Sequence, residues 1–236
     1  YRDMLVESMS EKEAIQEVMD DMNSLCRSFI RWIDEYLNER RKLNIPRNQP
    51  YCRTYKSKYK NKNPWITVIY KPDEVSHIKF MVDNFSYTWY QSPIGLRVFA
   101  IAHDSLSIYN GHLFGRYNER LNLTIGQPLA RVHHFFENNR VLAPTEYERD
   151  GHKCLVGVCP TGYILGEQRE DLECNVFKTF IARSNAGPRL SSVRDDLLAS
   201  LDALDTQEPN PLSPQQAPPS DSIKARLRLA LAGNPI

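Results

Sequence analysis

The sequence predicts an α+β protein in which a long N-terminal helix packs on a mostly antiparallel sheet with two short helices, followed by a flexible C-terminal tail. Three observations lead to this fold class. A long helical pattern opens the chain, strand-like segments then follow one another around two short helical patterns, and the composition changes after residue 185. Helices and strands grouped in this way are typical of α+β domains, whereas alternating βα units would predict a parallel sheet.

The size and charge of the chain narrow the class of protein only partly. Its 236 residues can form one sizeable domain, or one domain with appendages. The net charge of +1 indicates no particular partner, but residues 46–124 hold 11 Lys and Arg against 5 Asp and Glu. We divide the chain into an N-terminal helix (1–45), an α+β core domain (46–185), a helix with a Pro-rich linker (186–220) and a short amphipathic C-terminal helix (221–236).

The cysteines predict a reduced, cytoplasmic protein. Their number is odd, and no pair has the C-x-x-C spacing of zinc and redox motifs; they are Cys26, Cys52, Cys154, Cys159 and Cys174. We therefore expect no disulfide, no metal and no cofactor. We also expect no membrane span and no signal peptide. A chain that begins with Tyr rather than Met fits a fragment of a longer product.

Residues 10–43 predict one long helix. Ser10 and Glu13 have the spacing of a capping box, and Pro46 ends the helix. Apolar residues at alternating spacings of three and four form one stripe, namely Ile15, Val18, Met22, Leu25, Phe29, Trp32 and Tyr36. A second set widens this stripe: Met19, Cys26, Ile30, Ile33 and Leu37. This helix either packs on the core or, because the stripe spans roughly ten turns, binds a protein partner or a second copy.

Residues 51–63 alternate basic and aromatic side chains. As a strand, this segment directs Lys56, Lys58, Lys60 and Lys62 to one face and Tyr51, Arg53, Tyr55 and Tyr59 to the other. Cations for phosphates and rings for stacking are what a nucleic-acid surface needs. The candidate nucleic-acid-binding residues are therefore Arg53, Lys56, Lys58, Lys60, Lys62, Tyr55 and Tyr59. The alternative is a lysine-protected edge strand or a solvated loop.

The remaining segments complete the sheet and its helices. β-branched and aromatic residues predict strands at 65–70, 84–91, 95–108, 152–159, 163–168 and 176–182. Helical patterns occur at 73–82, 111–121, 127–139 and 189–206. The last piece, 221–232, is a basic amphipathic helix that we expect to fold against a partner, a membrane surface or a second copy.

Other histidines lack partners at a useful spacing. His103 and Asp104 are adjacent in a predicted strand, so their side chains point to opposite faces. His133 and His134 are adjacent in a predicted helix, and one nearby carboxylate is too little for a zinc site. We interpret the latter two as partly packed surface residues.

The segment from Gly111 to Leu121 carries the main candidate site. His112, Arg116 and Arg120 follow one another at four-residue spacing, which places them on one face of a helix. An imidazole beside two permanent cations predicts an anion or phosphate site.

The pattern H-x-x-x-R-Y-x-E-R from His112 to Arg120 resembles the H-x-x-x-R-[MFY]-x-x-R helix of small bacterial toxin-like domains. Those domains belong to the barnase–EndoU–colicin–RelE group of metal-independent ribonucleases. In that group a few antiparallel strands follow the helix, and the last often carries Thr or Ser. Residues 151–158, 162–167 and 177–181 match those strands in order. The resemblance implies a toxin-like nuclease of bacterial or phage type.

The resemblance also implies a role for each residue. RNA cleavage without metal needs an acid or base and fixed positive charge at the phosphate. His112 would be the acid or base, and Arg116 and Arg120 would hold the phosphate. Tyr117 would stack on a base or donate to the phosphate, and Thr179 would hydrogen-bond it from the sheet.

Two functions from different classes are therefore open. The first is a metal-independent, RNA-cleaving nuclease. The second is a non-catalytic module that binds nucleic acid or protein, in which the same helix carries only a solvated, charge-paired face. Its partners would be RNA or another nucleic acid, or a protein or second copy bound through the helices at 10–43 and 221–232. A nuclease requires His112, Arg116 and Arg120 to open into one concave surface facing the sheet, with Thr179 or Tyr163 within reach.

Overall fold

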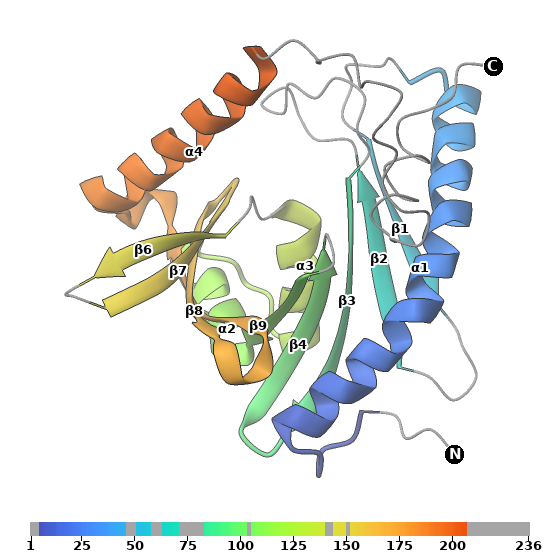
Figure 1. The fold of residues 1–236 in the computed structure, drawn as a ribbon, viewed down its shortest axis with the longest axis horizontal. Coiled ribbons are helices and arrows are strands. Elements are labelled where there is room, and N and C mark those ends of the chain that lie inside the picture. The colour runs from blue at the N-terminus through green and yellow to red at the C-terminus, as the bar shows by residue number, and fades with distance from the viewer. Residues whose placement is uncertain are drawn as a thin grey trace, which may run out of the picture.

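The structure, a computed structural model, describes residues 5–45, 51–57, 63–70, 83–102, 105–139, 144–149 and 152–206. In these residues nine strands form one sheet (Figure 1). The strands are β1 (Cys52–Ser57), β2 (Trp65–Tyr70), β3 (Asp83–Ser92), β4 (Gly95–Ala102), β5 (Ser105–Asn110), β6 (Thr145–Arg149), β7 (His152–Cys159), β8 (Gly162–Arg169) and β9 (Cys174–Ala182). The α-helices of the same residues are α1 (Glu11–Lys42), α2 (Gly111–Arg120), α3 (Pro128–Asn138) and α4 (Pro188–Thr206). The predicted α+β class with a large sheet is thus confirmed.

The sheet is mixed rather than purely antiparallel. Its strand order is β1-β2-β3-β4-β5-β9-β8-β7-β6, and of these neighbours only β5 and β9 are parallel. The parallel pair runs from Ser107 opposite Asn175 to Tyr109 opposite Phe177. It joins two antiparallel groups of strands into one sheet and places β9 beside the strand that leads into α2.

The single strand predicted at 95–108 is two strands. β4 and β5 pair antiparallel, with Arg97 opposite Asn110 and Ala102 opposite Ser105. No Gly or Pro separates the two strands, so their apolar pattern reads as continuous in the sequence. The sequence pattern also does not predict β6, because this strand is short and rich in charged residues.

Helix α1 begins and ends within one residue of its prediction. The capping box is present: the Ser10 backbone N–H donates to Glu13 Oε2 at 2.8 Å, and the Glu13 N–H donates to Ser10 Oγ at 3.3 Å. The bonds that the Glu13 carboxylate accepts from the Ser10 backbone N–H and hydroxyl lower the pKa of this carboxyl. The apolar stripe of α1 belongs to one buried cluster with residues from β1, β2, β3, β4, β5 and β9. Within it, Trp32 stacks on Tyr55 of β1 with ring centroids 5.5 Å apart.

Helices α2 and α3 cover the opposite face of the sheet. Successive strand residues alternate between faces. In β9, Val176 belongs to the cluster of α1, whereas Phe177 belongs to the cluster of α2 and α3. Helix α4 lies on the same face as α1, at the other end of the sheet, where Leu190 clusters with Val156 and Tyr163. The sheet therefore separates α1 and α4 from α2 and α3.

Several predicted features lie outside the described residues: the helix at 73–82, His103 and Asp104, the side chains of Lys58, Tyr59, Lys60 and Lys62, the linker at 207–220 and the helix at 221–232. The domain boundaries stay predictions. Within the described part of the chain, no helix is long and apolar enough to cross a membrane.

Candidate functional site

Helix α2 follows β5 without an intervening loop. Asn110 occupies the N-cap position, but its side chain makes no capping hydrogen bond. The helix begins at Gly111, where a Cβ atom would lie 3.0 Å from the Cβ of Leu96 in β4, so this close approach favours glycine. Leu113 and Phe114 are buried beneath the helix. Their burial against the sheet turns the side of α2 that carries His112 outward.

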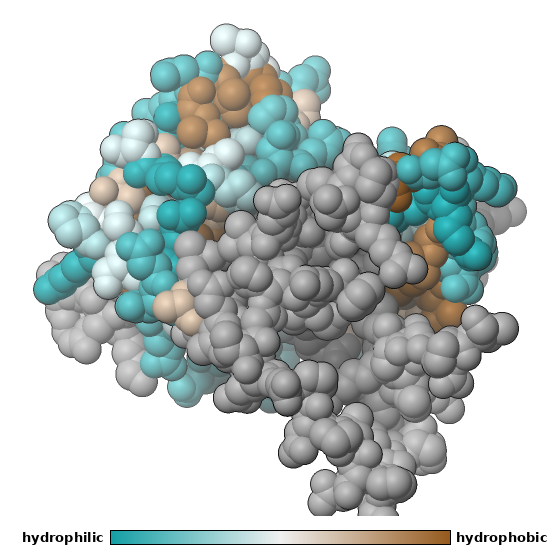
Figure 2. All heavy atoms as spheres, turned by 90° about the horizontal axis from the view of Figure 1, so that it is seen from above, coloured by the Kyte–Doolittle hydropathy of each residue, from teal (hydrophilic) through white to brown (hydrophobic). Residues whose placement is uncertain are grey.

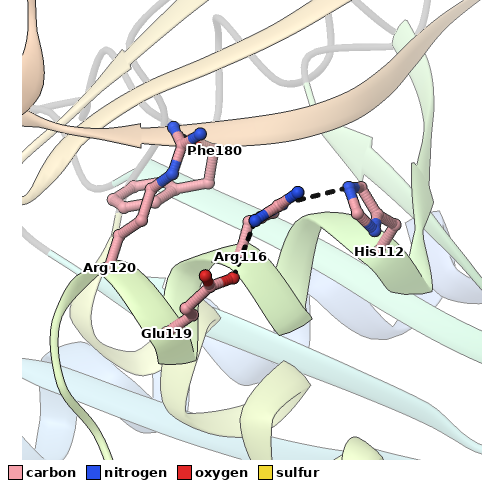
Figure 3. A network of polar contacts seen from close by, with 5 residues as sticks. All are labelled: His112, Arg116, Glu119, Arg120 and Phe180. Carbon is pink, nitrogen blue, oxygen red and sulfur yellow. Dashed lines mark hydrogen bonds and ion pairs between the residues drawn. The ribbon is translucent and has the colours of Figure 1, made fainter.

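His112, Arg116 and Glu119 form a chain of contacts on this outer side (Figure 3). Arg116 Nε donates to Nε2 of His112 at 3.3 Å, and Arg116 Nη1 lies 2.9 Å from Oε2 of Glu119. The side chain of Arg116 keeps about 40% of its surface exposed, and His112 and Glu119 are exposed. The guanidinium is therefore held at two points and still reaches solvent.

Arg120 does not join this group. Its guanidinium donates to the backbone carbonyl oxygen of Phe180 in β9. Figure 3 shows it turned toward that strand, while Arg116 points along the helix toward His112. The four-residue spacing puts the two arginines on one side of α2, but the hydrogen bond to β9 directs Arg120 away from His112 and Arg116.

Tyr117 is a core residue. It is 1% exposed, and its ring makes edge-to-face contacts with Phe135 and Phe180 at centroid distances of 5.1 and 5.2 Å. Its hydroxyl lies 3.0 Å from Nδ1 of His134. Burial raises the pKa of Tyr117. The ring is thus not available to stack on a base, which is one of the two roles predicted for it.

Thr179 lies on the other face of the sheet from α2. It pairs with Leu165, which packs in the cluster of α4, whereas the next residue, Phe180, belongs to the cluster of α2 and α3. Tyr163 is buried in the cluster of α4 as well. The structure therefore brings neither predicted sheet residue within reach of His112.

In the described part of the predicted basic strand, β1, Arg53 and Tyr55 lie on one face and Lys56 on the other, as the alternation predicts, but α1 covers the first of these faces. Arg53 forms an ion pair with Glu39 of α1, and its guanidinium lies 5.3 Å from the ring centroid of Tyr55. Tyr55 is buried, and its hydroxyl donates to the backbone carbonyl of Trp32 at 3.0 Å. Burial raises its pKa to about 12. Lys56, in contrast, is exposed on the face of α3.

Sequence reasoning missed a polar group around α3. Nδ1 of His133 lies 3.0 Å from the hydroxyl of Tyr87, and the ring of Trp89 meets the imidazole edge-on at 5.3 Å. Burial lowers the pKa of His133; nearby Glu137 raises it, and Lys56 lowers it. The four-residue spacing of His133 and Glu137 is visible in the sequence. No local pattern shows that Lys56 of β1 and Tyr87 and Trp89 of β3 lie beside them.

This group does not form a metal centre. Among the described residues, no cluster of three or more His, Cys, Asp or Glu side chains is arranged to hold a metal ion. The chemistry that the described side chains of α2 and α3 offer is hydrogen bonding and charge, from imidazoles, partly exposed guanidinium groups and the carboxylates beside them.

No protein-family model, curated protein or solved structure matches this chain significantly. The fold and site define the class only as an α+β protein with an exposed His/Arg pair on one helix.

Proposed function

We propose that this protein binds nucleic acid, with RNA as the favoured ligand, through the outer side of α2. The observation that carries the proposal is the arrangement of Arg116 between His112 and Glu119. A guanidinium held at two points loses less conformational entropy when it binds a phosphate, and it presents a planar pair of donors. The exposed imidazole of His112 adds a second group that can contact the same phosphate.

The surroundings of α2 support a polyanionic ligand rather than a single small anion. Helix α3 lies against α2 on the same face and carries His133 and His134. Lys56 is exposed beside α3. The acidic residues Glu119 and Glu137 make this surface mixed in charge, so we expect moderate and strongly salt-dependent affinity.

A second candidate function is metal-independent RNA cleavage with His112 as the base. The observation that favours it is that an exposed imidazole, His112, lies 3.3 Å from Nε of a cation, Arg116, so that one phosphate could meet both groups. Cleavage also needs donors around the phosphate. Arg120 is bonded to a backbone carbonyl and Thr179 lies across the sheet, so Arg116 would supply this charge alone. Binding without cleavage is therefore the better-supported function.

The experiment measures affinity for a labelled single-stranded RNA of mixed sequence over a series of salt concentrations. We expect Arg116→Ala to weaken binding roughly tenfold, the equivalent of one charge-assisted hydrogen bond, and to reduce the salt slope by about one. Arg31→Ala is the matched control, because Arg31 is an exposed cation on α1, across the sheet. Equal affinity of wild type and Arg116→Ala would contradict the proposal.

The same samples in EDTA distinguish the two functions. RNA that stays intact while it binds supports a non-catalytic protein. Cleavage that disappears in His112→Ala but persists in Arg31→Ala supports the nuclease. Cleavage that persists in His112→Ala indicates either another site or a contaminating enzyme, and contradicts a catalytic role for His112.

A further inference from the structure

Helix α1 exposes a second apolar stripe beside the one that it buries. Met19, Ile30 and Leu37 are 40%, 56% and 40% exposed, and Cys26 between them is half-buried. At 3.6 residues per turn these four positions lie within about 40° of one another around the helix. We call them the α1 seam. Viewed from above, hydrophobic surface lies among hydrophilic surface at the right of the molecule, the side where Figure 1 places α1 (Figure 2).

A row of charges runs along the α1 seam. Asp20, Arg27, Asp34 and Arg41 are all exposed, follow one another at seven-residue spacing and alternate in sign. A seven-residue repeat of apolar and flanking charged residues is the pattern by which one helix recognises another. Asp20 accepts a hydrogen bond from Gln16, one turn earlier in α1.

We propose that the α1 seam binds the α1 seam of a second copy of this chain, antiparallel, about a two-fold axis near Ile30. In such a pair, the register that sets Asp20 level with the partner's Arg41 also sets Arg27 level with the partner's Asp34. The symmetry then repeats both contacts, which gives four pairs of opposite charge. The same register places Ile30 against the partner's Ile30 at the axis.

The charges favour this arrangement over a parallel one. In a parallel pair in register, each charge of the row lies level with the same residue of the partner, so no opposite charges meet. An isologous two-fold contact needs a surface that is complementary to itself when reversed, and the alternating row of charges has this property. Because α1 and α2 lie on opposite faces of the sheet, the pair leaves the proposed nucleic-acid surface open, and the two proposals can fail independently.

The first test is the mass of the full-length chain in solution over a range of concentrations, measured by light scattering or sedimentation. We expect a reversible dimer for wild type and a monomer for Ile30→Glu. Ile94→Glu is the control, because Ile94 is 78% exposed in the turn between β3 and β4 and should leave the dimer intact. Unfolding curves of both variants establish that they are folded.

The second test uses the charges. Asp34→Arg should weaken the dimer at low salt, because it places the new arginine level with the partner's Arg27. The double variant Arg27→Asp/Asp34→Arg exchanges the two signs and should restore the dimer. Failure of this restoration would overturn the proposed register.

A cysteine variant fixes the direction of the pair. Ile30→Cys places two thiols together at the axis, so we expect it to form a disulfide-linked dimer that wild type does not. In the same register Met19→Cys places the two new thiols about 35 Å apart, so it should not cross-link. A monomer at all concentrations, a dimer that survives Ile30→Glu, or equal cross-linking of both cysteine variants would overturn the proposal.

Discussion

Nε1 of Trp65 donates a hydrogen bond to Oδ2 of Asp21 at 2.9 Å, and both side chains are buried. Nδ2 of Asn63 donates to the same oxygen, also at 2.9 Å. One carboxylate thus ties α1 to the start of β2. The contact joins the N-terminal helix to the sheet through a residue 44 positions away in the chain, which no local sequence pattern reveals.

This contact predicts a large cost for Asp21→Ala. The substitution leaves two buried N–H groups without their acceptor, so we expect the free energy of unfolding to fall by about 2–4 kcal/mol. Urea denaturation measures this change, with Arg31→Ala as an exposed α1 control that should stay within about 0.5 kcal/mol of wild type. A cost for Asp21→Ala no larger than that of the control would show that the contact does not hold α1 in place.

The two arginines of α2 should behave differently. Arg120→Ala removes a charge-assisted hydrogen bond to the Phe180 carbonyl, so we expect it to lower stability by about 1–2 kcal/mol. Arg116→Ala breaks only exposed contacts, with Glu119 and His112, so its stability should change by less than about 0.5 kcal/mol while its RNA affinity falls. Thermal unfolding and RNA binding, measured on both variants, test this separation. Equal stability losses in the two variants would contradict it.

Sequence patterns located α1 and α2 well because their signals are local. The Ser10–Glu13 capping box and the apolar spacing of α1 act within a few residues of each other, and both appear in the structure. The same patterns cannot tell which apolar stripe the sheet will cover. The stripe that contains Trp32 is buried, whereas Ile30 is left exposed.

The candidate site was harder to predict, because it depends on which face each residue occupies. Phe177 of β9 faces α2, so Thr179, two residues later, would face α2 as well if the strand alternated regularly between the two faces. The pairing of β8 with β9 is irregular at this point: Thr179 pairs with Leu165, Phe177 pairs with Gly166, and Lys178 falls between. One extra residue reverses the face of those beyond it. Tyr117 was placed on the correct helix, but its contacts with Phe135 come from α3 and lie beyond any local pattern.

The environment of His133 predicts a pH dependence of stability. Its pKa in the folded protein is lowered from 6.5, chiefly by burial, so the unfolded chain binds a proton at higher pH than the folded one. The contribution of neutral His133 to the free energy of unfolding is therefore complete above about pH 6.5. It is lost as the pH falls toward the pKa of His133 in the folded protein. The loss should be smaller than the limit of about 1.4 kcal/mol per pH unit for one group, because the ring is partly solvated.

The measurement is the free energy of unfolding of wild type and His133→Asn between pH 7.5 and about pH 5. Asn keeps a polar group near the Tyr87 hydroxyl and removes the titration. We expect the stability of the variant to fall less steeply on acidification. Parallel curves for the two proteins would mean that the proton uptake comes from other groups.

Two glycines should respond in opposite directions to the same added methyl group. At Gly162, in β8, a Cβ atom would overlap the backbone carbonyl oxygen of Ile181 in β9 and lie 2.9 Å from the ring of Phe180. Because backbone on both sides must move, we expect Gly162→Ala to lower the free energy of unfolding by about 1–3 kcal/mol.

At Gly115, in α2, a Cβ atom would meet nothing within 4 Å. Gly115→Ala should therefore raise the free energy of unfolding by about 0.5–1 kcal/mol, because alanine restricts the unfolded chain and favours the helix. Urea denaturation of the two variants tests both signs. A stabilised Gly162→Ala would mean that β8 and β9 are less closely paired than the structure has them, and a destabilised Gly115→Ala would mean that the outer side of α2 is covered.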